Sequence, residues 1–169
     1  HLTDRKCDML CRKWERNGNG ENGIIVTSDL LLDHIHDNYP GFYFVSSTTK
    51  VLEKFEELET ELERPEFRYV VPDFRLNKAF ERLEGLAQDR KDKIEFLCNE
   101  GCYFGCRDRK ACYENVSRKA LGENVADHIC RAPGAAKGYV FSEAMENPGF
   151  IGPGEIREFY RPMGFSEFK

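Results

Sequence analysis

The sequence lacks long apolar runs, clustered basic charge and several common catalytic motifs. Its apolar runs are only a few residues long and 33% of its 169 residues are charged, so no membrane span is predicted. A net charge of −5 argues against a nucleic-acid surface, because phosphate binding needs clustered Lys and Arg. No G-x-S-x-G, H-E-x-x-H or Walker sequence occurs, which leaves serine hydrolase, zincin and nucleotidase activities without support.

An export signal is also missing, whereas cysteine is abundant. An odd number of cysteines without an export signal argues against a disulfide framework and favours a reducing, cytoplasmic compartment. Clustered cysteines in such a compartment more often hold metal. The seven cysteines are Cys7, Cys11, Cys98, Cys102, Cys106, Cys112 and Cys130.

From residue 23 onward, short β-rich runs alternate with amphipathic helical stretches. Strand starts near residues 23, 43, 67 and 93 leave room for one helix between successive strands, which is typical of βαβ units and a parallel sheet. A doubly wound sheet and a (β/α) barrel both show such a repeat. The expected strands are 23–27, 42–45, 67–71 and 93–97, and the expected helices are 30–38, 51–62 and 76–87.

We interpret the chain as an α/β protein, a partial TIM-type (β/α) barrel with a cysteine-rich metal-binding loop. A complete barrel typically needs about 250 residues. This chain starts at His1 without a Met and stops at Lys169 directly after an apolar run, so we expect a fragment whose other barrel half is its partner. Residues 1–22 are expected to form a helix, Leu2 to Trp14, and a turn-rich link; residues 23–169 form the partial barrel, with the cysteine-rich segment at 98–133.

Parallel architectures bind ligands at the carboxyl ends of their strands, and the expected ends here are polar. Asn99 and Glu100 follow the fourth strand, where a carboxylate can act as a general base or orient a substrate. The alternative is a turn-forming Asn beside a solvated Glu.

Two further strand ends carry candidates. Asp73 and Arg75 can pair with each other or bind an anionic substrate, and helix capping by Asp73 is the alternative. Ser47 and Thr48 offer hydroxyl groups at an expected helix start, a geometry that binds phosphate, and capping is again the alternative.

Cys102, Cys106, Cys112 and Cys130 follow the pattern C-x3-C-x5-C-x17-C in a stretch short of aliphatic residues. Such a segment cannot build a core, and four thiolates on zinc or an iron–sulfur cluster would substitute for one. The alternatives are buried or incidental thiols. Cys98 is in phase with strand core residues and His128 can replace a thiolate, while Cys7 and Cys11 fit one turn of an ordinary helix.

Three runs, "KIEFLCNEGCYFGCRDRKACYE", "HICRAP" and "GEIREFYRPMGFSEFK", resemble the second half of the U32 peptidase family barrel. That family includes collagenase-like peptidases and proteins that hydroxylate RNA bases or ubiquinone precursors, several of which hold a four-iron cluster on four cysteines. The resemblance therefore implies a 4Fe-4S cluster in preference to zinc, and a redox or hydroxylation reaction. A U32-type peptidase and a noncatalytic protein with structural zinc are the alternatives.

Overall fold

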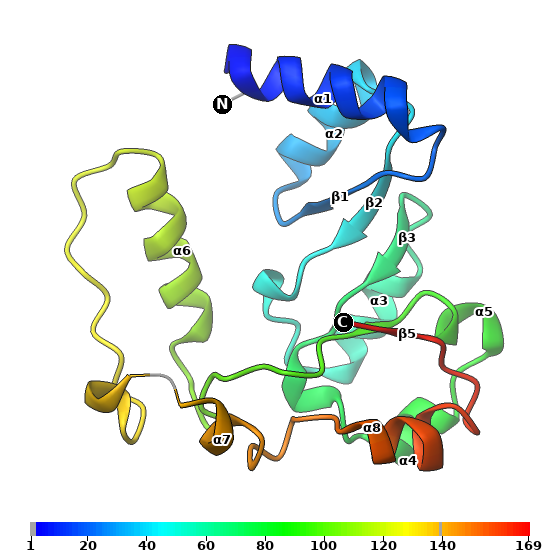
Figure 1. The fold of residues 1–169 in the computed structure, drawn as a ribbon, viewed down its shortest axis with the longest axis vertical. Coiled ribbons are helices and arrows are strands. Elements are labelled where there is room, and N and C mark those ends of the chain that lie inside the picture. The colour runs from blue at the N-terminus through cyan, green and yellow to red at the C-terminus, as the bar shows by residue number, and fades with distance from the viewer. Residues whose placement is uncertain (1–2, 139) are drawn as a thin grey trace.

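The structure is a computed structural model that describes residues 3–138 and 140–169. Neighbouring strands are parallel throughout, and they lie side by side in the order in which they occur along the chain (Figure 1). An isolated parallel bridge connects Val70, the last residue of β3, to Ile94, the residue before β4. The strands are β1 (Gly23–Val26), β2 (Tyr43–Ser46), β3 (Phe67–Val70), β4 (Glu95–Phe96) and β5 (Glu167–Phe168).

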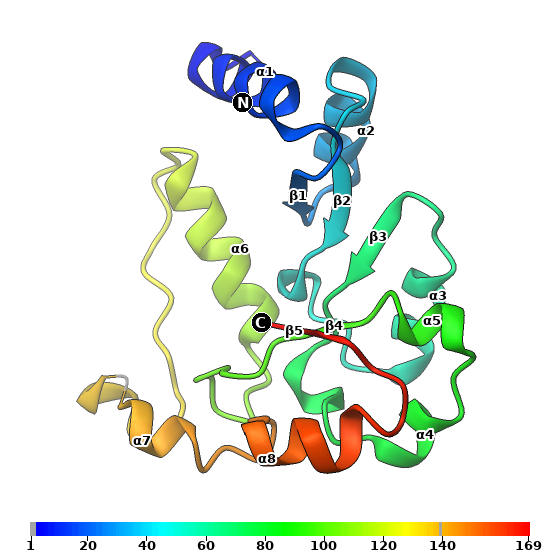
Figure 2. The same ribbon diagram turned by 45° about the vertical axis from the view of Figure 1, so that its right-hand side comes forward.

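This arrangement confirms the predicted parallel α/β fold, in which helical segments connect successive strands. Among the described residues the strands form a sheet of β1, β2 and β3 and a separate pair of β4 and β5, and these do not close into a barrel. Figure 2 shows the C-terminal strand β5 running alongside β4. No described helix combines the length and apolarity needed to cross a membrane.

The helical elements vary widely in length. They are α1 (Arg5–Gly18), α2 (Asp29–Asn38), η1 (Thr48–Lys50), α3 (Phe55–Leu62), η2 (Phe74–Leu76), α4 (Phe80–Glu84), α5 (Gln88–Lys91), α6 (Arg109–Ala120), η3 (Ala135–Lys137), α7 (Phe141–Ala144), α8 (Pro153–Glu155) and the π-helical turn Ile156–Tyr160.

The N-terminal helix starts later and runs further than predicted. Asp4 accepts hydrogen bonds from the backbone N–H groups of Lys6 and Cys7, which caps α1 at Arg5, and Asn19 ends the helix in a left-handed conformation. Leu2, the predicted first residue, lies outside the described part of the chain.

Two predicted helices are shorter than expected, each for a local reason. The predicted helix 51–62 begins only at Phe55, because Val51, which caps the end of η1, has a φ of 57° that breaks the helical path. Within the predicted helix 76–87, only the last residue of η2 and the whole of α4 are helical, and α5 begins after it at Gln88. Buried Asn77 lies at this break and donates from Nδ2 to the carbonyl oxygens of Leu97 and Gly149 at 3.0 and 2.8 Å.

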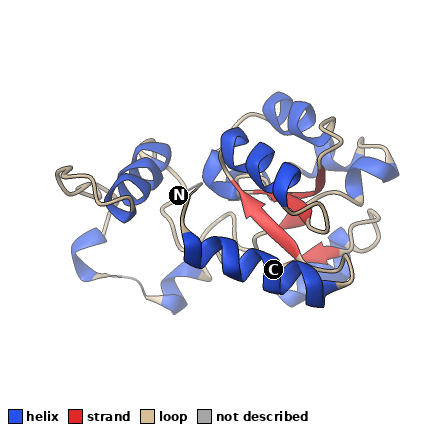
Figure 3. Ribbon diagram, turned by 90° about the horizontal axis from the view of Figure 1, so that it is seen from above, coloured by secondary structure: helices blue, strands red, loops and turns tan. Residues whose placement is uncertain are grey.

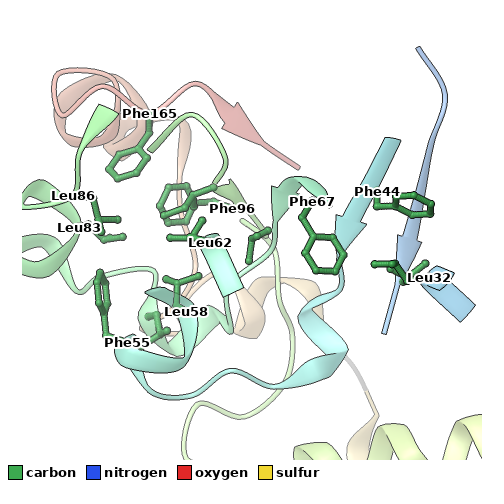
Figure 4. Packing of buried hydrophobic residues seen from close by; sticks show 14 of the residues in the cluster. Leu32, Phe44, Phe55, Leu58, Leu62, Phe67, Leu83, Leu86, Phe96 and Phe165 are labelled. Atoms are coloured by element: carbon green, nitrogen blue, oxygen red, sulfur yellow. The ribbon is translucent and has the colours of Figure 1, made fainter. Parts of the chain in front are cut away.

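The core lies between the sheet, the helices beside it and the C-terminal segment (Figure 4). Phe96 of β4 is fully buried, and its ring centroid lies 4.9 Å from Tyr160 and 5.1 Å from Phe165. Burying one such side chain contributes roughly 1.5 to 3 kcal/mol. These aromatic contacts attach the end of the chain to β4, although the two are about seventy residues apart in sequence.

A second region, residues 101–147, is organised differently, and we call it the cysteine arm. It contains α6, η3 and α7, and it stands to one side of the strands in Figure 1; Figure 3 shows the same separation from above. Of its described residues only Arg109 and Ala144 are buried. The arm therefore has almost no apolar core of its own.

Candidate functional site

The polar residues that follow successive strands meet at one edge of the sheet. Thr27, after β1, lies 2.5 Å from Thr49 through their hydroxyl oxygens, and Thr48, after β2, donates to the carbonyl oxygen of Pro72 at 3.2 Å. Arg109 then connects Asp73, after β3, to the chain that follows β4. This edge is where a parallel α/β protein binds its ligand.

Arg109 of α6 is the central cation of this edge. Its side chain is 2% exposed, and its Nη2 donates to Glu100 Oε2 at 2.5 Å while its Nε lies 3.3 Å from Asp73 Oδ2. The guanidinium carbon also lies 4.7 Å from the ring centroid of Phe74. A buried cation needs such paired carboxylates, because an uncompensated charge in the interior is very costly. Two of its donor atoms, Nε and Nη1, have no hydrogen-bond acceptor in the described structure.

Asp73 and Arg75, both predicted as candidates, bind each other. Arg75 donates to Asp73 from Nε at 2.6 Å and from Nη2 at 3.0 Å, and its Nη2 lies 2.8 Å from Glu53 Oε1. Asp73 also accepts the backbone N–H of Arg75 and so caps η2. Since Arg75 Nη1 donates to the Cys106 carbonyl at 2.9 Å, this pair also connects the sheet edge to the cysteine arm.

Both carboxylate oxygens of Glu100 accept hydrogen bonds that fix its orientation, whereas Asn99 is exposed. Glu100 Oε1 accepts the Cys102 backbone N–H at 2.9 Å, and Oε2 accepts from Arg109. Glu100 therefore holds the first turn of the cysteine arm against Arg109. Asn99, beside it, has its side chain at the surface.

Ser47 and Thr48 cap and connect elements at the end of β2. Ser47 Oγ accepts the Thr49 N–H at 3.2 Å and thereby caps η1, which is the alternative stated for these hydroxyl groups. η1 is only three residues long and contacts α6. These contacts place the two predicted residues beside the start of the cysteine arm.

The four predicted metal-binding cysteines are free thiols. Cys102, Cys106 and Cys112 are partly buried, and Cys130 is exposed. Burial raises the pKa of the Cys102 thiol, and the adjacent Arg109 guanidinium offsets part of that rise. Within residues 3–138 and 140–169, no three His, Cys, Asp or Glu side chains lie together in a way that can hold a metal ion.

Cys102 and Cys130 nevertheless line the same cavity of about 700 Å³ at the base of the arm. The chemistry of the donor set, four thiols in a region without a core, suits zinc or iron. The side-chain positions do not form a metal centre, so metal binding would have to draw the four sulfur atoms together.

The remaining cysteines and His128 lie elsewhere. Cys98 is partly buried and packs against the hydrophobic core, as its phase in the strand indicates. Cys7 and Cys11 lie one turn apart on α1, away from the arm. His128 donates its backbone N–H to Asn115 Oδ1 at 3.2 Å, a contact that involves no ring nitrogen.

Sequence reasoning missed two buried ionic groups. The burial of Arg109 could not be predicted from the residues around it, because it depends on carboxylates that follow two different strands. Glu61 accepts from Lys50 Nζ at 2.5 Å and from Ser46 Oγ at 2.6 Å, all at low exposure. The burial of Glu61 could have been predicted from the sequence, because Glu61 lies three residues after Leu58 and therefore on the apolar side of α3.

Fold and site together define a mixed α/β protein with parallel strands and a polar, cysteine-bearing edge at their carboxyl ends. Comparisons with protein-family models, with curated proteins and with solved structures found no match to this chain.

Proposed function

We propose that this chain belongs to a U32-like (β/α) barrel and binds an iron–sulfur cluster through Cys102, Cys106, Cys112 and Cys130. The observation that carries the proposal is the shared cavity: Cys102 and Cys130 are far apart in sequence, yet both line one hollow beside the carboxyl ends of the strands. The sequential, unreversed order of the parallel strands supports the barrel, because a doubly wound sheet reverses its strand order.

Arg109 places a buried positive charge beside Cys102. Burial raises the pKa of the Cys102 thiol and this cation offsets only part of that rise, so metal binding itself would have to drive the loss of the proton. The free thiols also agree with a reducing, cytoplasmic compartment, which is part of the proposal.

A bound cluster would supply one-electron chemistry for a redox or hydroxylation reaction. The chain's own residues would bind and orient the substrate at the strand ends, with Asn99, Glu100, Asp73 and Arg75 near the reacting centre and Ser47 and Thr48 at its border. Glu100 is positioned by Arg109 for this role.

Because the sulfurs do not converge in the structure, binding and ordering of the arm should be coupled. Anaerobic reconstitution with iron and sulfide should give broad visible absorbance and about four irons per chain. Replacing any of the four cysteines by Ser should abolish it, whereas Cys7→Ser and Cys11→Ser on α1 should leave it unchanged. Loss in all variants, or none in any, would contradict the ligand assignment.

Structural zinc is the second candidate, favoured by the lack of a core in the arm. Colourless protein with one zinc per chain would establish it over the cluster. Protein that binds neither metal would overturn both candidates.

A further inference from the structure

The cavity at the base of the cysteine arm has walls that are held in place by the rest of the fold. One wall is the turn Gly101–Gly105. A second wall is the segment 143–148, which begins in the last turn of α7 and continues past its end. Asn147 Nδ2 donates to the Cys102 carbonyl oxygen at 2.6 Å and so joins these two walls. Buried Asn77 holds the Gly149 carbonyl at 2.8 Å, which anchors the second wall to the sheet region.

The charged groups of the cavity are all of one sign. Among its described lining residues the only charged side chains are Glu143 and Glu146. The backbone N–H of Glu146 donates to the Glu143 carbonyl at 3.2 Å, so the helical turn of α7 continues and presents residues three apart on one side. Two carboxylates without a cation in the same cavity leave a negative potential that an incoming positive group can neutralise.

An aromatic ring belongs to the first wall, the turn Gly101–Gly105. Tyr103 is 48% exposed and lines the cavity. A Cβ at Gly105 would lie 2.8 Å from the Tyr103 ring, so the ring lies directly against the backbone there. An aromatic face attracts a cation within about 6 Å of its centre, by roughly 0.5 to 1 kcal/mol at an exposed site.

From this geometry we propose that the cavity binds an organic cation, an amine or a guanidinium, between the carboxylates of Glu143 and Glu146 and the ring of Tyr103. A volume of about 700 Å³ lies in the range of small-molecule sites, and it accommodates an arginine side chain with its adjoining peptide groups. None of these three side chains is a thiol, so variants of the cation site and variants of the metal ligands can be tested separately.

The positive group has two sources, an arginine or lysine of a peptide and a free polyamine. Full-length protein, with its metal content measured, is titrated by NMR at low ionic strength with N-acetyl-arginine methylamide, with its citrulline counterpart and with spermidine. The arginine and citrulline probes are nearly the same size and differ in charge. Stronger binding of the arginine probe assigns the peptide source, and stronger binding of spermidine assigns the polyamine source.

Three variants test the assignment of residues. Glu143→Gln and Glu146→Gln should each weaken binding of the cation roughly two- to fivefold, as expected for an exposed ion pair. Tyr103→Leu should weaken it by a similar factor, and Tyr103→Phe should restore it, because the ring face and not the hydroxyl attracts the charge. Glu158→Gln, at an exposed glutamate outside the cavity, is the matched control and should change nothing.

Equal binding of the arginine and citrulline probes, together with no binding of spermidine, would overturn the proposal. So would cation binding that survives the double variant Glu143→Gln with Glu146→Gln. A protein that fails to bind metal but still discriminates arginine from citrulline would refute the metal centre alone, so the two proposals fail separately.

Discussion

The sheet region and the cysteine arm reach stability in different ways. The sheet region, residues 23–97 and 149–169, contains nearly all of the buried apolar side chains, whereas the described arm buries only Arg109 and Ala144. The arm is attached instead through polar contacts, from Arg109 to two carboxylates and from Asn147 to Cys102. Apolar packing thus forms the scaffold, and a few polar contacts position the region that carries the cysteines.

The largest expected loss of stability comes from disrupting the apolar packing of the sheet region. Phe96→Ala removes a fully buried ring that packs against Tyr160 and Phe165, and should lower the free energy of unfolding by about 3 to 5 kcal/mol. Urea denaturation followed by circular dichroism measures it. Phe141→Ala in the arm, at a ring 55% exposed, should cost less than about 0.5 kcal/mol. Similar losses in both variants would show that the two regions do not differ as described.

A second prediction concerns the ionic attachment of the arm. Arg109→Met keeps much of the side-chain volume but leaves Glu100 without its cation and Asp73 with Arg75 alone, and should cost about 3 kcal/mol. Adding Glu100→Gln to Arg109→Met should recover part of the loss, since it removes the uncompensated charge. The control is Arg107→Met, at an exposed position, which should be nearly neutral. No recovery in the double variant would argue against the pairing.

The same contrast explains how much the sequence could predict. The strands β1, β2 and β3 were found within one or two residues, because their apolar runs are local and the helices between them are amphipathic. The helices near Val51 and Asn77 were predicted too long, since a left-handed residue and hydrogen bonds to distant carbonyls interrupt them. Contacts between residues that are distant in sequence cannot be predicted from the local spacing of apolar residues.

The candidate site also contains residues that the sequence could predict and residues that it could not. Asp73, Arg75 and Glu100 could be picked out because they lie just after strands. The structure brings Asp73 and Glu100 together around one buried cation, and Arg75 binds Asp73. That cation, Arg109, could not be recognised, because nothing in its neighbourhood distinguishes it from the exposed Arg107. Metal binding by the four cysteines stays a prediction that metal analysis tests.

A third prediction isolates the polar contact that joins the cavity walls. Asn147→Ala removes the hydrogen bond to the Cys102 carbonyl, worth about 1 kcal/mol. Hydrogen exchange followed by mass spectrometry should then show faster exchange in residues 101–106 and 141–148 and unchanged exchange in β1, β2 and β3. Asn99→Ala, at an exposed side chain, is the matched control. Faster exchange throughout the sheet would mean that the arm supports the scaffold.

The smallest expected effect lies in the sheet region and depends on pH. Burial raises the pKa of Glu155, but hydrogen bonds from Lys78 and from the Gly152 N–H outweigh it, so that the pKa lies below its ordinary value. A lowered folded-state pKa means that the unfolded chain takes up the proton first as the pH falls. The stabilisation is therefore complete at neutral pH and is lost as the pH falls below the ordinary glutamate range. Because the side chain is 36% exposed, solvent screening limits the contribution to about 0.5 kcal/mol.

Glu155→Gln should lower the free energy of unfolding by that amount at pH 7 and by nearly nothing at low pH, measured by urea denaturation at both pH values. A loss that is equal at the two pH values would show that the missing carboxylate acts through packing and not through its charge.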